Sequence, residues 1–308
     1  MTDTSIMDHA LLLLPDFLLI ACGFVICRYT PLDRPVWDGA ERLVYYVLFP
    51  VLLFSSIVRS PLSLASLAGF GAAGVAVLGI GIALAFALGR VPGVDARTHA
   101  AGAQVAFRFN SYVALALSER LGGAGGVATM ALLVALAVPV CNVAAVWPLA
   151  RHGGHGYGRE LARNPLIIGT LSGLAGNALG VQFPEAVATT LQRIGVAALP
   201  LGLMAVGAGL RFGALREAPR LAAALLAIRH LVLPAAALVL VQWAPLSPVQ
   251  RMMLVLFAAM PTASSAYVLA VRMGGHAGFV AGLVTVSTMV GMVGVPVTLA
   301  LFYAMSPR

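Results

Sequence analysis

Ten apolar runs follow one another along the chain, and only short stretches connect them. A helix needs about 20 apolar residues to cross the hydrocarbon core of a bilayer, and each run is about that long. We therefore predict an all-α, polytopic membrane protein. The predicted spans are 9–28, 41–59, 64–89, 98–120, 126–149, 164–182, 187–210, 219–243, 249–272 and 277–304.

The composition argues against a soluble domain and against a nucleic-acid-binding protein, which a net charge of +8 would otherwise suggest. The chain is 60% hydrophobic and only 10% charged, with a mean hydropathy of +0.96, whereas about 25% of the residues of a soluble domain are charged. A nucleic-acid-binding face needs clustered cations, but here the arginines interrupt apolar runs. We expect a lipid bilayer as the partner and no nucleic acid. The three cysteines lack metal-ligand spacing, so no metal site is predicted.

The distribution of arginine predicts the orientation in the membrane. An external N-terminus places twelve arginines on the cytoplasmic side and five outside, with Arg108 and Arg229 inside spans. This excess on one side is the positive-inside pattern. With an even number of spans, both termini are expected outside.

Two sets of residues recur at a nearly constant offset, which indicates an internal repeat. Each predicted half contains five spans, and an odd number means that the second half enters the membrane in the opposite direction. The predicted organisation is a first repeat over 1–150, a cytoplasmic loop over 151–163 and a second, inverted repeat over 164–308. The alternative is that residues match at this offset by chance, because the chain is rich in glycine. Pro15, Gly23 and Pro50 recur as Pro165, Gly173 and Pro200 at offset 150, and Arg120–Gly123 recurs as Arg272–Gly275 at offset 152.

One cation lies too deep in a span for an ordinary lipid-facing helix. Arg108 is roughly 15 Å from either end of its span at the helical rise per residue. A charge at that depth costs several kcal/mol unless it faces a cavity or a partner, so it indicates a functional site. Gln104, Asn110 and Tyr112 lie close by and favour a binding surface. An arginine that braces neighbouring carbonyl groups is the alternative.

The repeat pairs this segment with one that contains a proline at mid-span. Pro261 pairs with Phe109 at offset 152 and is followed by Thr262, Ser264 and Ser265. A proline removes one helical hydrogen bond, and hydroxyl groups can satisfy the freed backbone. Two interrupted helices would present half-helix N-termini, with their partial positive charge, to an anion. A simple proline kink is the alternative.

Two further ionisable residues lie within predicted spans, and the sequence allows two interpretations of each. Asp16 is either a carboxylate that couples transport to protons or sodium, or an interfacial acid that reaches water. Arg229, which precedes His230 and Pro234, either attracts an anion or extends toward the cytoplasm.

Six segments, in this order and spacing, resemble the auxin efflux carrier family. This family includes plant PIN exporters and bacterial malonate or malate permeases. The resemblance covers nearly the whole chain, although each motif alone is weak. The segments are Leu43–Ser56, Phe107–Tyr112, Asn164–Ile168, Leu199–Leu210, Arg229–Pro234 and Met260–Gly275.

The resemblance implies a ten-helix inverted-repeat fold, similar to that of bile-acid symporters and sodium/proton antiporters. Spans 1, 2, 6 and 7 would form a scaffold, and spans 3–5 and 8–10 a moving transport unit in which spans 4 and 9 cross. Plant exporters are expected to carry proline in both crossing helices, but this chain has Phe109 in the first. A bent or continuous first crossing helix is therefore the alternative to a full break at Phe109. The absence of a long central loop favours a bacterial carrier in the inner (cytoplasmic) membrane with periplasmic termini, and a homodimer fits the family.

The implied function is secondary transport of a small organic anion by elevator-type alternating access. The substrate would be a mono- or dicarboxylate, auxin-like or malonate/malate-like, and no cofactor is expected apart from coupling to protons or sodium. A sodium-coupled, bile-acid-like symporter is the alternative. An intramembrane enzyme is disfavoured, because no metalloprotease or serine-hydrolase motif occurs. The expected substrate site comprises Gln104, Arg108, Asn110, Tyr112, Thr262, Ser264 and Ser265, with helix breaks at Phe109 and Pro261 and Asp16 as the coupling candidate.

Overall fold

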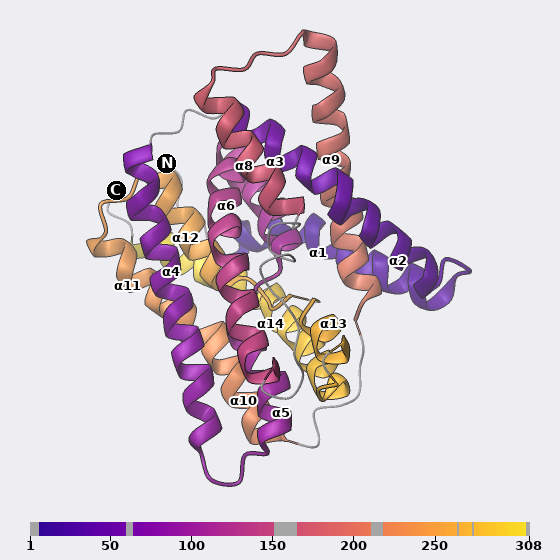
Figure 1. Cartoon of the computed structure of the whole chain (residues 1–308), viewed down its shortest axis with the longest axis vertical. Coiled ribbons are helices and arrows are strands. Elements are labelled where there is room, and N and C mark those ends of the chain that lie inside the picture. The colour runs from indigo at the N-terminus through magenta and orange to yellow at the C-terminus, as the bar shows by residue number, and fades with distance from the viewer. Residues whose placement is uncertain are drawn as a thin grey trace.

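The computed structural model describes residues 6–59, 64–150, 165–210, 218–263, 265–272 and 274–305, and the regular elements in these ranges are all helical (Figure 1). Five helices are long and apolar enough to cross a membrane, and Phe17–Tyr29 and Pro248–Ala259 are shorter apolar helices. The all-α class is confirmed, and the helices are those of a polytopic membrane protein. The count of ten spans and the inverted repeat stay predictions.

Helix boundaries agree with the predicted spans to within four residues, except at the start of the second. There an amphipathic segment extends the helix back to Arg34, seven residues before the predicted start. The elements are α1 (Ile6–Tyr29), α2 (Arg34–Leu43), η1 (Val44–Leu48), α3 (Phe49–Val58), α4 (Leu64–Ala87), η2 (Leu88–Arg90), α5 (Ala96–Gly102), η3 (Ala103–Ala106), α6 (Ser111–Ala150), α8 (Pro165–Ala178), α9 (Glu185–Ala208), α10 (Pro219–Ala227), η5 (Ile228–Val232), α11 (Leu233–Trp243), α12 (Pro248–Ala259), α13 (Ser265–Arg272) and α14 (Ala277–Met305).

Local sequence explains three irregularities inside these helices. The π-helical turns η1 and η5 end just before Pro50 and Pro234. Proline has no N–H for the carbonyl four residues earlier and its ring crowds that carbonyl, so a wider turn relieves the clash. Within α6, Gly123 has φ 56° and ψ −150°, which separates two helices at the boundary predicted between the fourth and fifth spans. Glycine adopts this conformation without a steric penalty.

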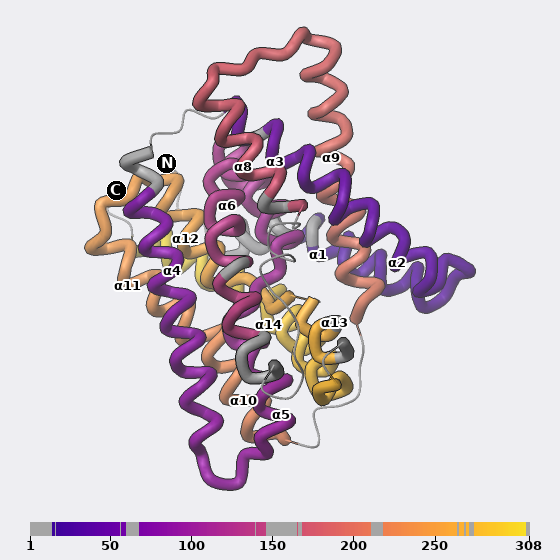
Figure 2. Tube along the Cα trace, viewed as in Figure 1, coloured from indigo at the N-terminus to yellow at the C-terminus, as the bar shows by residue number. Residues whose placement is uncertain are grey.

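The helices pack in two groups that meet along α6. Helix α1 packs along α9, and α3 packs along both α8 and α9; α12 is surrounded by α6, α11 and α14, while α4 lies against α6 and α11. Figure 1 shows α1, α2 and α9 on one side of the molecule and α4, α10 and α11 on the other, and Figure 2 follows the same path along the Cα trace. The separate roles of the two groups as scaffold and transport unit stay a prediction.

Glycines allow close backbone contacts in the first group. A Cβ atom on Gly23 of α1 would overlap the carbonyl group of Met204 in α9, and one on Gly173 of α8 would lie 3.2 Å from the carbonyl oxygen of Phe54 in α3. Gly23 and Gly173 differ by the repeat offset of 150, as do Phe54 and Met204. The two contacts are therefore counterparts under the offset read from the sequence.

The Gly23→Ala variant is expected to lower the free energy of unfolding by about 1–3 kcal/mol, because α1 must move away from the α9 backbone. Gly39→Ala is the matched control, since a Cβ on Gly39 in α2 meets no atom within 4 Å. Thermal unfolding of the purified proteins in detergent measures both effects. Equal stability of Gly23→Ala and the native protein would contradict the close packing of α1 on α9.

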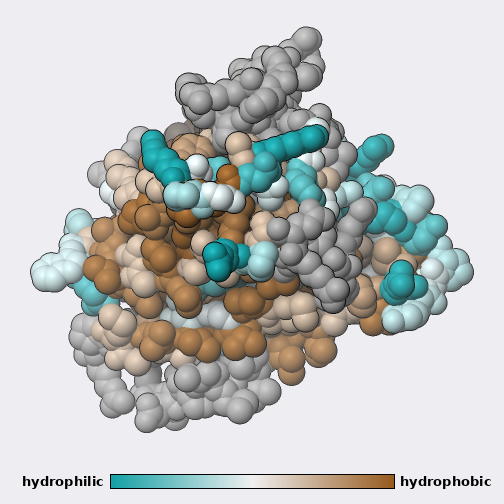
Figure 3. Space-filling view, turned by 90° about the horizontal axis from the view of Figure 1, so that it is seen from below, coloured by the Kyte–Doolittle hydropathy of each residue, from teal (hydrophilic) through white to brown (hydrophobic). Residues whose placement is uncertain are grey.

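Much of the outer surface is apolar, as a lipid-facing surface must be. Large exposed side chains include Leu171, Leu231, Val239 and Val293, each more than half exposed. The face in Figure 3 shows broad hydrophobic areas interrupted by a few hydrophilic patches. Membrane proteins can expose such surfaces because the surrounding lipid is itself apolar.

Candidate functional site

The segment with Arg108 is interrupted, although it lacks a proline. The 3₁₀ turn η3 ends at Ala106, the chain leaves helical geometry over 107–110, and α6 begins at Ser111. The chain is thus interrupted at Phe109, and the alternative of a bent or continuous helix is wrong. Phe109 itself is buried and packs against Phe257 of α12, with ring centroids 4.6 Å apart.

Asn110 explains how the chain breaks there. Its Oδ1 accepts hydrogen bonds from the backbone N–H groups of Tyr112 (3.0 Å) and Val113 (3.2 Å), so it caps the N-terminus of α6. Its own backbone N–H donates to the carbonyl oxygen of Pro261 at 2.8 Å. The break is stabilised by this cap and by a bond to the other interrupted segment.

The second break lies where Pro261 predicts it. Helix α12 ends at Ala259, residues 260–263 are not helical, and α13 begins at Ser265. The backbone N–H of Thr262 donates to Ser287 Oγ of α14 at 2.9 Å. Through the bond from Asn110 to Pro261, the two breaks are in direct contact. Ser264 lies outside the described residues.

Arg229 holds the end of α12. Its Nε donates to the carbonyl of Met260 at 2.6 Å, and its Nη2 donates to the carbonyls of Phe257 (3.0 Å) and Ala258 (3.2 Å). The side chain is 0% exposed, so the interpretation that it extends to the cytoplasm is wrong. The last carbonyls of a helix have no intrahelical donor, and Arg229 supplies donors and a matching positive charge.

Arg108 lies beside both breaks and is 8% exposed. Its Nη1 donates to Ser265 Oγ at 3.0 Å, and its Nη2 donates to Asn142 Oδ1 at 2.8 Å. The acceptors of these two bonds are neutral side chains, and the bonds orient the guanidinium group. Sequence reasoning missed Asn142, although a polar residue in the middle of the fifth predicted span is a visible signal.

Two predicted site residues contain buried oxygen atoms that accept no hydrogen bond from the described part of the chain. Gln104 donates through Nε2 to the carbonyls of Ala101 (3.0 Å) and Ala266 (3.2 Å), which leaves Oε1 unsatisfied. Thr262 is 0% exposed, and its Oγ1 is also unsatisfied. Buried polar atoms of this kind are rare, and they are compatible with a group that the described residues do not supply.

Tyr112 lies on the boundary between the two groups of helices. Its ring stacks on that of Phe49 in α3, with centroids 4.7 Å apart and planes at 28°. Gly202 of α9 leaves room for this pair, because a Cβ there would lie 3.2 Å from Phe49 and 3.6 Å from Tyr112. The predicted site residue therefore contacts the helices assigned to the scaffold.

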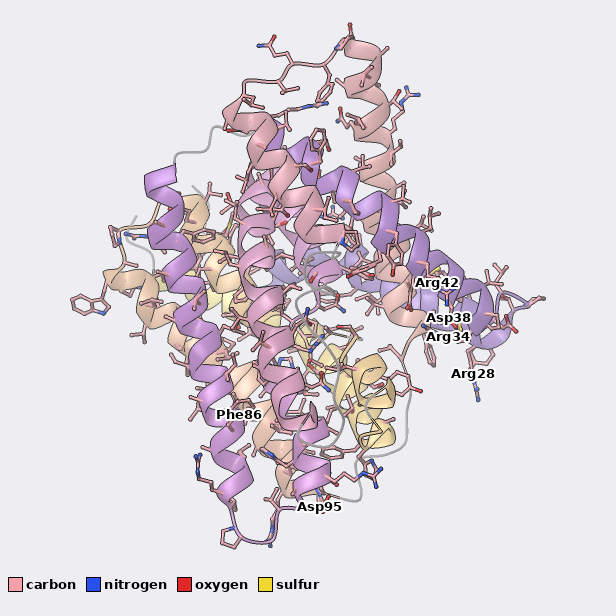
Figure 4. The ribbon with its side chains drawn as sticks, viewed as in Figure 1. Arg28, Arg34, Asp38, Arg42, Phe86 and Asp95 are labelled. Atoms are coloured by element: carbon pink, nitrogen blue, oxygen red, sulfur yellow. The ribbon has the colours of Figure 1, made fainter. Side chains whose placement is uncertain are left out.

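Several other charged residues of the described part lie away from the two breaks. Asp16 is within α1, and its side chain is outside the described part. Figure 4 shows Arg28, Arg34 and Arg42 together near the corner between α1 and α2, and Asp95 at the turn between α4 and α5. The N–H of Thr98 donates to Asp95 Oδ2 at 2.7 Å, and this bond lowers the pKa of Asp95. An open pocket there is lined by Asp95, Arg97, Thr98 and residues 275–278, away from the breaks.

Comparisons with known proteins agree with this description of a membrane protein. Residues 155–299 match the model of a family described as "Membrane transport protein". The chain is also 24% identical over 291 residues to a protein of Rhizobium meliloti (strain 1021) named "Putative malonate transporter", a match that covers 85% of this chain and 86% of the relative.

Proposed function

Since these matches identify the chain as a membrane transporter of the auxin efflux carrier family, we propose that it carries small organic anions, mono- or dicarboxylates such as malonate, by secondary transport. The observation that supports this proposal most directly is the position of Arg108. Its guanidinium group lies at the contact between two interrupted segments and is oriented by Ser265 and Asn142.

The groups around Arg108 suit a carboxylate. An anion that leaves water needs charge-assisted hydrogen bonds, and a guanidinium fork matches a carboxylate in two-point geometry. The N-terminus of α6 adds partial positive charge at the same place. Asn110 uses only Oδ1 for the cap, so its Nδ2 is available in this proposal as a donor to the substrate.

The boundary near Tyr112 suits an elevator-type movement. In our proposal the group of helices that contains both breaks slides against α3 and α9 and carries the anion from one side of the membrane to the other. The stacked rings of Tyr112 and Phe49 lie on this boundary. Small residues such as Gly202 keep the facing surface smooth.

The test is counterflow of labelled malonate, malate and lactate in proteoliposomes that contain the purified protein, with two variants of one residue. Asn110→Ala removes the cap and the Nδ2 donor and is expected to slow exchange at least about tenfold. Asn110→Asp keeps an oxygen for the cap but replaces the donor by a negative charge. If Asn110 binds the substrate, Asn110→Asp also loses exchange; if it only orders the backbone, this variant exchanges like the native protein.

The sodium-coupled alternative makes a different prediction for the same vesicles. It requires an inward sodium gradient for uptake, whereas our proposal expects equal exchange in sodium-free potassium buffer. Uptake of every acid that depends on sodium would overturn this part of the proposal. Failure of all three acids to exchange under both conditions would reject the proposed substrate class.

A further inference from the structure

The π turn η5 brings two neighbouring residues to the second break from different directions. Pro234 has no N–H for the carbonyl of His230, four residues earlier, and the chain widens there into the π turn. Arg229 points to the end of α12, as its bonds to Met260 and Phe257 show. The side chain of His230 reaches α14, and π turns of this kind are frequent at functional sites.

His230 is connected to the broken backbone through one serine. The Nε2 atom of His230 lies 2.8 Å from Ser287 Oγ, and the same oxygen accepts the backbone N–H of Thr262 at 2.9 Å. Ser287 and Thr262 are both fully buried. A serine hydroxyl has one hydrogen and two lone pairs, so when the neutral imidazole carries its hydrogen on Nδ1, Ser287 accepts from Thr262 and donates to Nε2.

A proton on Nε2 of His230 reverses the direction of its hydrogen bond with Ser287. Protonated Nε2 must donate, so the oxygen of Ser287 then accepts from both Thr262 and His230. Its hydrogen turns to another acceptor, and for a serine in a helix the ordinary choice is the carbonyl four residues earlier, here that of Leu283. In each protonation state the hydroxyl of Ser287 thus keeps its bond from Thr262 and has an acceptor for its hydrogen.

The charges around His230 make this proton sensitive to an anion. The elements packed against η5 are α4, α10, α11, α12, α14 and η3, and their charged residues are cations. A second positive charge beside Arg229 is unfavourable in a buried region, and an anion bound near Arg108 offsets it. By linkage, binding of the anion and of the proton then favour each other. The titratable or charged residues on η5 and on these elements, besides His230, are Arg220, Arg229, Arg251 and Tyr303.

We propose that His230 is a proton-binding site that couples anion transport to protons: one proton binds at His230 when the anion binds at the breaks, and the two cross the membrane together. This inference rests on the proposed transport of organic anions and adds its driving ion. It places the coupling site at His230, next to Arg229, whose side chain caps α12. The sequence analysis had instead named Asp16 as the coupling candidate.

Malonate accumulation under a pH gradient tests the coupling, and counterflow without a gradient tests transport itself. Proteoliposomes at pH 8 inside and pH 7 outside, with equal potassium and valinomycin to hold the membrane potential at zero, should accumulate malonate about tenfold, the limit for one proton per anion. His230→Gln should keep counterflow but reach an inside-to-outside ratio of one. His276→Gln, at the open pocket away from the breaks, is the matched control and should accumulate malonate like the native protein.

A pH-sensitive dye inside vesicles of equal pH supplies a second readout on the native protein alone. Addition of malonate outside should acidify the interior, and malonate entry without acidification would overturn the proposal. Accumulation by His230→Gln equal to that of the native protein would also overturn it. If His230→Gln does not fold, His230→Asn takes its place. Loss of counterflow in the native protein would instead reject the proposed function, so the two failures are distinguishable.

Discussion

Replacement of Arg229 by glutamine is expected to lower the free energy of unfolding by about 3–5 kcal/mol, the largest stability effect that we predict for a single side chain. The guanidinium group donates to the carbonyls of Met260, Phe257 and Ala258, where α12 ends inside the protein. Glutamine is shorter and has one donor group, so buried carbonyls lose their partners, and each unsatisfied group costs about 1–3 kcal/mol. The charge that complements the C-terminal end of the helix is also lost.

Thermal unfolding in detergent, followed by size-exclusion chromatography, measures this effect. Arg220→Gln is the matched control, because Arg220 lies on α10, on the same continuous helix, but is exposed, and such surface changes usually alter stability by less than about 0.5 kcal/mol. Arg229→Lys should fall between the two, since it keeps the charge but not the planar fork. An Arg229→Gln protein as stable as Arg220→Gln would show that α12 does not depend on this cap.

The position of Arg229 also shows why the sequence predicted the helices better than the site. A span is a local pattern of apolar residues, and its ends agree with the structure to within a few residues in nearly every case. The partners of Arg229 come from a break about 30 residues further along the chain. Without that contact, the sequence analysis considered only an anion site or an extension toward the cytoplasm for Arg229.

The first break illustrates the same difference. Pro261 predicts the second interruption by itself, because the loss of a backbone donor is encoded in one residue. The interruption at Phe109 depends on the cap from Asn110 and on its bond to Pro261, which is 151 residues away. The sequence predicted a contact between the two segments but left open whether the first helix breaks without proline, and the tertiary structure shows that it does. Asn142 was visible as a polar residue within a predicted span, but its bond to Arg108 appears only in the tertiary structure.

Replacement of Arg108 by glutamine is expected to raise the malonate concentration for half-maximal counterflow by roughly 10²–10³-fold, the largest effect on transport that we predict. Loss of one partner from a buried, hydrogen-bonded charge pair costs about 2–5 kcal/mol, and the middle of that range corresponds to such a factor. Glutamine can still donate to Ser265 or Asn142, two of the present partners of Arg108. The thermal stability of the variant should therefore remain close to that of the native protein.

Two further variants separate the charge of Arg108 from its geometry. Arg108→Lys keeps the positive charge but cannot hold a carboxylate through two parallel bonds, so its transport should lie between those of Arg108→Gln and the native protein. Arg120→Gln removes an exposed cation from the end of the same α6 segment and should leave transport unchanged. Equal loss in Arg120→Gln and Arg108→Gln would indicate a general effect of positive charge on anion attraction. Loss confined to residue 108, with lysine intermediate between glutamine and arginine, requires a carboxylate in direct contact with the guanidinium group between the two breaks.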